Sequence, residues 1–173
     1  MESVNQFIRD VPDFPKEGII FKDITPLLGD STAFQKTINS LKDRYAGKQV
    51  DAVVGVEARG FIFASALAYA LGTGVVMVRK PGKLPYKTFQ ETYSLEYGTD
   101  TIEIHQDALQ AGQNIVIIDD VLATGGTLAA TLDLIRKNFE AVNIVEAAFL
   151  IELDFLQGRE KLKDTPVHSM IHY

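Results

Sequence analysis

The sequence contains no cysteine, which excludes a disulfide framework, a thiolate metal site and a cysteine nucleophile. It contains three histidines, His105, His168 and His172, whose scattered positions lack the spacing of a zinc site. Long apolar runs are missing as well: the longest, from Phe61 to Leu71, falls well short of the ~20 residues that a transmembrane helix needs. We therefore expect no zinc centre and no membrane partner.

Positive charge is also scarce. The 17 Lys and Arg residues are outnumbered by 23 Asp and Glu residues, which gives a net charge of −6 and a pI near 5.0. This balance argues against a broad electrostatic attraction to nucleic acid and leaves room only for a local basic patch, so we expect no nucleic-acid partner. The first residues have neither the basic segment nor the apolar segment of a signal peptide, and we expect a cytoplasmic protein.

The 173 residues are typical of one domain, and their pattern alternates strands with helices. Short apolar runs predict buried strands, and longer segments with helical spacing predict helices. The predicted strands are residues 50–56, 74–78, 113–118 and 142–153, and the predicted helices are residues 31–47, 61–71 and 127–139. This alternation predicts an α/β fold with a mostly parallel central sheet flanked by helices.

Two segments lie outside this alternation. Val4, Phe7, Ile8 and Val11 have helical spacing and predict a short opening helix before a turn-rich stretch. Residues 79–93 are polar and rich in proline, glycine and lysine, which is typical of a functional lid. Alternating residues at 93–97 and 101–105 predict a β-ribbon attached to that loop.

The most informative segment is Ile115–Thr127, in which a buried strand ends in two acids and a short loop leads into a helix. Backbone N–H groups of residues 123–127 at the start of that helix are suited to bind phosphate. Asp119 and Asp120 repel phosphate, so we expect them to face a sugar diol or Mg²⁺. Either acid alone is more simply a solvated turn residue, but the coincidence of strand, acids, loop and Gly-Gly favours a phosphate site. The Walker lysine and the Rossmann glycine pattern are both missing.

A net acidic protein that binds a polyanion needs local positive charge. Basic residues stand at predicted strand ends or in the polar loop, and they are Arg59, Arg79, Lys80, Lys83 and Lys87. For the three lysines a solvated loop face is an equally good interpretation.

Ile115–Thr127 resembles the phosphoribosyl pyrophosphate (PRPP) signature of the type I phosphoribosyltransferases. Three further stretches extend the resemblance, to the adenine branch of that family, over nearly the full length: residues 14–28, residues 57–61, and residues 79–85 together with 93–98. The resemblance implies a single type I phosphoribosyltransferase domain over residues 1–173. It has an N-terminal hood of about residues 1–30, a flexible lid of about residues 80–98 and a PRPP-binding motif at residues 115–127.

The activity implied is transfer of 5-phosphoribosyl from PRPP to adenine, which gives AMP and pyrophosphate in purine salvage. The resemblance also implies Mg²⁺, held mainly by PRPP with water-mediated contact to Asp119 or Asp120, and a homodimer.

Residue roles follow from the same resemblance. The 5′-phosphate is assigned to Ala123, Thr124, Gly125, Gly126 and Thr127, and the ribose hydroxyls to Asp119 and Asp120. Pyrophosphate is assigned to Arg59, Arg79, Lys80 and Lys83. The adenine pocket is assigned to Ile20, Phe21, Lys22 and Val121. Glu96 is the expected catalytic residue, at the imidazole edge of the purine. The lid tip at residues 86–90 has no clear match in the family.

Two alternatives have specific expectations. An enzyme for a 6-oxopurine usually has an aspartate where this chain has Ala123, and orotate is a further acceptor. A regulator that senses PRPP and binds nucleic acid needs an added DNA-binding segment or a basic face. The residues before Val50 are too few for both such a segment and a hood.

Overall fold

The computed structural model describes residues 4–94, 98–162 and 164–173. The chain divides into two compact units, one up to Ala46 and one from Gly47 onward, and each is described by itself. None of the described helices is long and apolar enough to cross a membrane.

The first unit combines a β-hairpin with helices. Its elements are the 3₁₀ helix η1 (Val4–Phe7), strands β1 (Arg9–Pro12) and β2 (Ile20–Asp23), and helices α1 (Thr25–Gly29) and α2 (Ser31–Arg44). The Asp30 side chain caps α2 by accepting a hydrogen bond of 2.8 Å from the Ala33 amide.

The predicted opening helix is confirmed only for its first residues, as the 3₁₀ helix η1, because the chain then continues as strand β1. Strand β1 pairs antiparallel with β2, from Arg9 opposite Asp23 to Pro12 opposite Ile20. The pairing satisfies backbone groups that a short isolated helix would leave unpaired, and the proline that follows Val11 disfavours a helical conformation there.

The second unit is built on a five-stranded sheet in the order β4-β3-β7-β8-β9. All neighbouring strands in it are parallel. The strands are β3 (Ala52–Val56), β4 (Gly74–Val78), β7 (Asn114–Leu122), β8 (Asn143–Glu152) and β9 (Val167–His172). The first four confirm the predicted strands, whereas β9 was not predicted because His168, Ser169 and His172 interrupt its apolar pattern.

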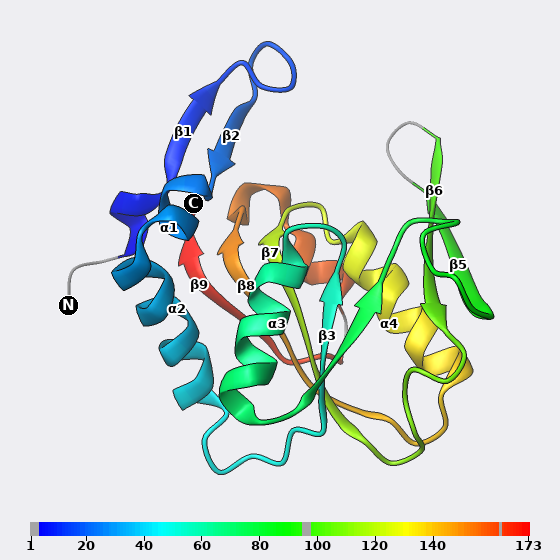
Figure 1. Cartoon of the computed structure of the whole chain (residues 1–173). Helices are drawn as coiled ribbons and strands as arrows, with labels where there is room; N and C mark the ends of the chain where they lie inside the picture. The colour runs from blue at the N-terminus through cyan, green and yellow to red at the C-terminus, as the bar shows by residue number, and fades with distance from the viewer. Residues whose placement is uncertain (1–3, 95–97, 163) are drawn as a thin grey trace. The chain divides into compact units, whose positions relative to one another are not determined.

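Helices α3 (Gly60–Leu71) and α4 (Gly126–Asn138) cover opposite faces of this sheet (Figure 1). The crossover from β3 through α3 leads to β4, whereas the crossover from β7 through α4 leads to β8 on the other side. Right-handed crossovers in opposite directions place their helices on opposite faces. The predicted α/β fold is therefore confirmed, with a core that includes Val54, Ile115, Ile117, Leu134 and Phe149.

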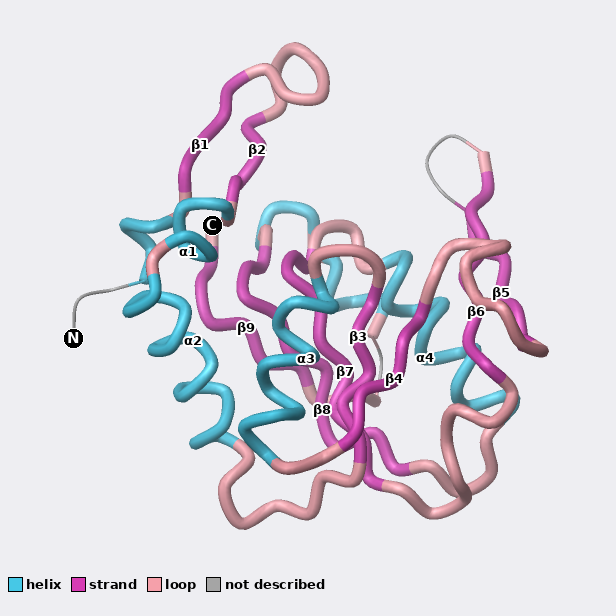
Figure 2. Tube along the Cα trace, in the orientation of Figure 1, coloured by secondary structure: helices cyan, strands magenta, loops and turns pink. Residues whose placement is uncertain are grey.

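A separate antiparallel ribbon of β5 (Thr88–Ser94) and β6 (Thr99–His105) lies beside α4 (Figure 2). The rings of Phe89 and Phe139 pack edge to face at 5.6 Å, and Lys137 pairs with Glu91 at 2.6 Å. The predicted ribbon is present, but its first strand begins earlier than expected, inside the segment predicted as a loop. Movement of this segment as a lid stays a prediction.

Candidate active site at the end of strand β7

The site lies where the winding of the sheet reverses. Strands β3 and β7 are neighbours, yet the chain leaves them in opposite directions, so their carboxyl ends open a crevice of the kind that binds ligands in α/β proteins. Gly60 allows α3 to begin close to β7: a Cβ at this position would lie 2.9 Å from Asp119 Oδ1 and from the Ile118 carbonyl oxygen. No larger residue fits there without a shift of the acid.

A tight loop between β7 and α4 forms the phosphate-binding candidate. Gly125 is buried and has a φ of 76°, a left-handed conformation that favours glycine. Helix α4 begins with no acidic residue in its first turn, so its free N–H groups and its dipole favour an anion.

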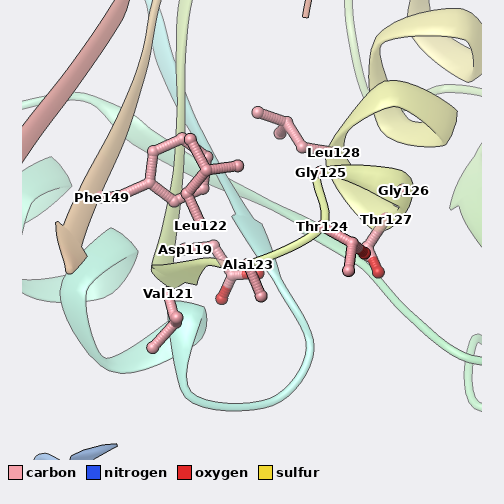
Figure 3. A pocket seen from close by; sticks show the side chains of 10 residues that line it. All are labelled: Asp119, Val121, Leu122, Ala123, Thr124, Gly125, Gly126, Thr127, Leu128 and Phe149. Carbon is pink, nitrogen blue, oxygen red and sulfur yellow. The ribbon is translucent and has the colours of Figure 1, made fainter. Parts of the chain in front are cut away.

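The loop lines a pocket of about 80 Å³. Figure 3 shows its walls, which run from the strand end at Asp119 and Val121 through the loop to Leu128, with Phe149 from β8. This volume is well below the ~300–1,000 Å³ of pockets that enclose a whole small ligand. The pocket therefore fits one group of a larger ligand, such as a phosphate. All five residues predicted for the 5′-phosphate line it.

The two predicted ribose acids lie next to each other near the end of strand β7, in different surroundings. Asp119 is half-buried and lines the pocket, and its Oδ1 accepts a hydrogen bond of 2.8 Å from the Asp120 amide. Asp120 is buried, and its Oδ2 lies 2.6 Å from Arg59 Nε as an ion pair. Burial and the charge of Asp120 raise the pKa of Asp119 well above its ordinary value. Burial also raises the pKa of Asp120, although the guanidinium of Arg59 opposes that shift.

Three of the four residues predicted for pyrophosphate are held by acids. Arg59 pairs with Asp120, and Arg79 donates to both oxygens of Glu57 at 3.2 Å. The Glu57 carboxylate also accepts from the Lys80 amide at 2.9 Å. Lys83 is exposed on the loop after β4. The cations are thus oriented before any polyanion arrives.

A chain of polar contacts connects Lys80 to the phosphate loop. The Lys80 ammonium pairs with the Asp100 carboxylate, which accepts from the Tyr93 hydroxyl at 3.2 Å. That hydroxyl lies 3.0 Å from Thr127 Oγ1. Burial alone would lower the pKa of Lys80, but Asp100, together with Tyr93 and Glu57, outweighs it and raises the pKa. The lysine is therefore fixed as a cation next to the ribbon.

Sequence reasoning missed Tyr93, Asp100 and the partnership of Glu57 with Arg79. Tyr93 and Asp100 alternate with other residues along a ribbon, so nothing in the local pattern separates them from ordinary strand residues. Their contacts join β5, β6, the end of β4 and the start of α4, which only the fold brings together.

The residues predicted for adenine belong to different units. Val121 lines the β7 pocket, whereas Ile20, Phe21 and Lys22 lie on strand β2 of the first unit. Phe21 packs edge to face on Phe14 at 5.2 Å. Glu96 lies outside the described residues. A shared adenine pocket and a catalytic Glu96 stay predictions.

The residues at the strand end fit a magnesium ion that is held mainly by its ligand. Asp119 and Asp120 supply two carboxylates, the donors that Mg²⁺ prefers, but too few for an all-protein cage. Within the described part of the chain, one group of three side chains has metal-ligand spacing, Glu152, Asp154 and His172. Its carboxylate Glu152 is already bound by Arg159, at 2.5 Å.

Comparisons with known proteins identify the family and the fold of this chain. The phosphoribosyl transferase domain family matches residues 31–170. The chain is 56% identical to the adenine phosphoribosyltransferase of Syntrophotalea carbinolica over the full length of both chains. It is also similar to the crystal structure of adenine phosphoribosyltransferase from Thermoanaerobacter pseudethanolicus, with 49% identity, a TM-score of 0.93 and 98% of each chain covered. The Saccharomyces cerevisiae enzyme, solved with adenine and an iminoalditol bisphosphate, matches at 43% identity, a TM-score of 0.90 and 96% of each chain covered.

The raised pKa of Asp119 predicts that this acid reduces stability. Its ionised form costs folding free energy above the raised pKa, and the cost fades as the pH falls through that pKa toward the ordinary value of 3.8. Asp119→Asn keeps the Oδ1 acceptor, so we expect a higher free energy of unfolding at pH 8 and a smaller gain at pH 5. Urea titrations at both pH values measure this, with the exposed Asp107→Asn as control. A variant less stable than wild type at pH 8, or a gain independent of pH, contradicts the prediction.

Proposed function

This chain belongs to the adenine phosphoribosyltransferases of the phosphoribosyl transferase domain family, and we propose that the site at the end of β7 carries their reaction. The enzyme transfers the 5-phosphoribosyl group of PRPP to adenine and gives AMP and pyrophosphate in purine salvage. The observation that supports the site most strongly is the pocket formed by the loop after β7 and the first turn of α4. It offers anion-binding amides directly beside two acids.

We propose that the loop and the two acids bind different parts of the phosphoribosyl group. We assign the 5′-phosphate to the N–H groups of residues 123–127 and to the hydroxyls of Thr124 and Thr127. We assign the ribose 2′- and 3′-hydroxyls to Asp119 and Asp120, because ionised carboxylates accept hydrogen bonds from a diol and repel a phosphate. Support comes from the position of Asp119 on the pocket wall.

We assign pyrophosphate, the leaving group, to the four basic residues that follow strands β3 and β4. Arg59, Arg79, Lys80 and Lys83 lie at or just beyond the carboxyl ends of β3 and β4. Negative charge grows on pyrophosphate as its bond to C1′ breaks, and fixed cations stabilise that charge more in the transition state than in the bound substrate. Ion pairs with Asp120, Glu57 and Asp100 already orient three of these cations, all but Lys83.

Magnesium fits the same place as a companion of PRPP. When bound, Mg²⁺ neutralises charge on the pyrophosphate group and strengthens its ability to leave. Asp119 and Asp120 are the residues that would hold it, through water, while PRPP supplies most of its ligands.

The residues that we propose for adenine come from strand β2, strand β7 and the predicted lid. We assign its ring to Ile20, Phe21, Lys22 and Val121, with Phe21 as the stacking residue. Purine N9 forms a bond to C1′ as the bond from C1′ to pyrophosphate breaks, with inversion through an oxocarbenium-like transition state. The proton displaced from the imidazole edge passes to the carboxylate of Glu96, which we propose as general base. Charged substrates such as PRPP do not cross membranes unaided, which supports a cytoplasmic location.

A homodimer is the assembly that we propose, with helix α3 and edge strand β4 as its surface. Along α3, Ile62 is 40% exposed and Tyr69 is 89% exposed, and on β4, Val75 is 42% and Met77 is 44% exposed. Exposed apolar side chains on an edge strand and on a neighbouring helix are typical of a surface that a protein partner buries. A second copy supplies one of the same chemistry by two-fold symmetry.

The activity is tested by AMP formation from PRPP and Mg²⁺ with adenine, hypoxanthine, guanine or orotate as acceptor. We expect kcat/KM for adenine to exceed that for hypoxanthine by about 10⁴, because hypoxanthine reverses the donor and the acceptor on the edge that carries position 6. A ratio below about 10² would favour the 6-oxopurine alternative.

The role of Glu96 is tested in the same assay of AMP formation. We expect Glu96→Gln to lower kcat more than it weakens adenine binding, because the proton is transferred only as N9 reacts. Full kcat in that variant would remove Glu96 from the mechanism.

The dimer is tested by sedimentation velocity. Met77→Glu places a charge in the proposed apolar interface, and we expect it to convert the wild-type dimer to a folded monomer. Phe155→Glu, at a residue 72% exposed on the segment after β8, is the matched control and should remain dimeric. A monomeric wild type, or a Met77→Glu variant that stays dimeric, contradicts the proposed surface.

A further inference from the structure

A turn far along the chain touches the phosphate loop backbone to backbone. Gly158 is buried at the start of the 3₁₀ helix η3 (Gly158–Lys161), which follows β8. A Cβ on Gly158 would overlap the Ala123 carbonyl oxygen and lie 2.9 Å from the Gly125 amide nitrogen. A Cβ on Gly125 would overlap the Gly158 carbonyl oxygen. Two glycines therefore form a contact that no side chain can enter.

The requirement for glycine has different causes at the two positions. Gly125 has a left-handed φ of 76°, so its backbone conformation alone favours glycine. Gly158 is not among the glycines with positive φ, and an alanine there meets no backbone strain. Space next to the loop is thus the reason for glycine at 158.

Arg159 fastens this turn to the sheet. Its Nε and Nη2 donate to the two carboxylate oxygens of Glu152 at 3.0 and 2.5 Å, and its Nη1 donates to the Val167 carbonyl at 3.1 Å. Ser169 Oγ donates to the same carboxylate at 2.6 Å. The hydrogen bonds from Arg159 and Ser169 outweigh burial and lower the pKa of Glu152. A two-pronged pair of this kind fixes both position and orientation.

The anchor stands directly beside the strand that carries the loop. Glu152 ends β8 opposite Leu122, the last residue of β7. One residue further, the Leu153 amide donates to the Leu122 carbonyl at 2.9 Å. Sheet pairing, the Glu152–Arg159 pair and the Gly158 contact thus form one continuous path from β8 to the back of residues 123–125.

We propose that Gly158 and Arg159 are positioning residues for the 5′-phosphate of PRPP, which rests on the function proposed above for this loop. Backbone amides bind an anion well only when they are already aimed at it, because reorienting them costs part of the binding energy. The turn holds the loop from behind, and Arg159 acts through Gly158 without touching the substrate.

The test is Gly158→Ala, with Gly29→Ala as matched control. Gly29 is exposed, a Cβ there meets nothing within 4 Å, and it is not among the glycines with positive φ. We expect Gly158→Ala to raise the KM for PRPP by about tenfold or more, with kcat at saturating PRPP and the KM for adenine within about threefold of wild type. Gly29→Ala should leave all three constants unchanged. A wild-type KM for PRPP in Gly158→Ala, or an equal loss in all three constants, overturns the proposal.

If Gly158→Ala does not fold, Arg159→Lys and Arg159→Ala test the same proposal. Lysine retains the charge but loses the two-pronged pair with Glu152. We expect the KM for PRPP to rise in both variants, more in Arg159→Ala, with kcat retained. An unchanged KM for PRPP in Arg159→Ala overturns the proposal. Wild-type protein that forms no AMP from adenine and PRPP refutes instead the function proposed for the site.

Discussion

The structure depends on one constraint, the meeting of one buried and one half-buried carboxylate with an anion-binding loop near the end of a single strand. Strand β7 places Asp119 and Asp120 where the sheet reverses its winding, directly before the loop at residues 123–127. The acids repel phosphate and the loop attracts it, which agrees with the proposal that the acids bind a sugar diol while the loop binds its phosphate. A phosphoribosyl group has that arrangement. Burial raises the pKa of both acids, so keeping them ionised here costs electrostatic free energy that hydrogen bonds to the carboxylates offset.

Charge organisation explains how an acidic protein binds a polyanion. The net charge of −6 gives no general attraction, but three cations near the sheet end are each paired with an acid. These pairs hold arginine and lysine side chains that would otherwise lose conformational entropy on binding. The contacts from Lys80 through Asp100 and Tyr93 to Thr127 join the pyrophosphate side of the site to the phosphate loop. The backbone of Gly158 packs directly against the same loop, at residues 123–125.

Sequence predicts most of the fold because strands buried on both faces are nearly all apolar. This applies to Ala52–Val56 and to Ile115–Ile118. Strand β9 was not predicted, because polar residues interrupt its apolar pattern. The opening segment has the spacing of a helix, but pairing with β2 decides its conformation. The position of the two acids and the loop at one end of β7 was predictable because these residues are contiguous, whereas their roles toward ribose and phosphate stay predictions. Asp100, Tyr93 and Gly158 were not predictable, since their contacts join segments that are distant in sequence and leave no local pattern. The adenine pocket and Glu96 remain predictions of the resemblance alone.

The central claim, that Asp119 and Asp120 bind the ribose hydroxyls beside a phosphate loop, is tested most directly by calorimetry with two ligands. Ribose 5-phosphate and 2-deoxyribose 5-phosphate differ by one hydroxyl and share the phosphate. Wild-type protein should bind the deoxy compound about tenfold more weakly, the value of one hydrogen bond to a charged group. In the double variant Asp119→Asn, Asp120→Asn the two ligands should bind with nearly equal affinity. A tenfold preference that survives in the double variant would contradict the assignment of these acids to the ribose.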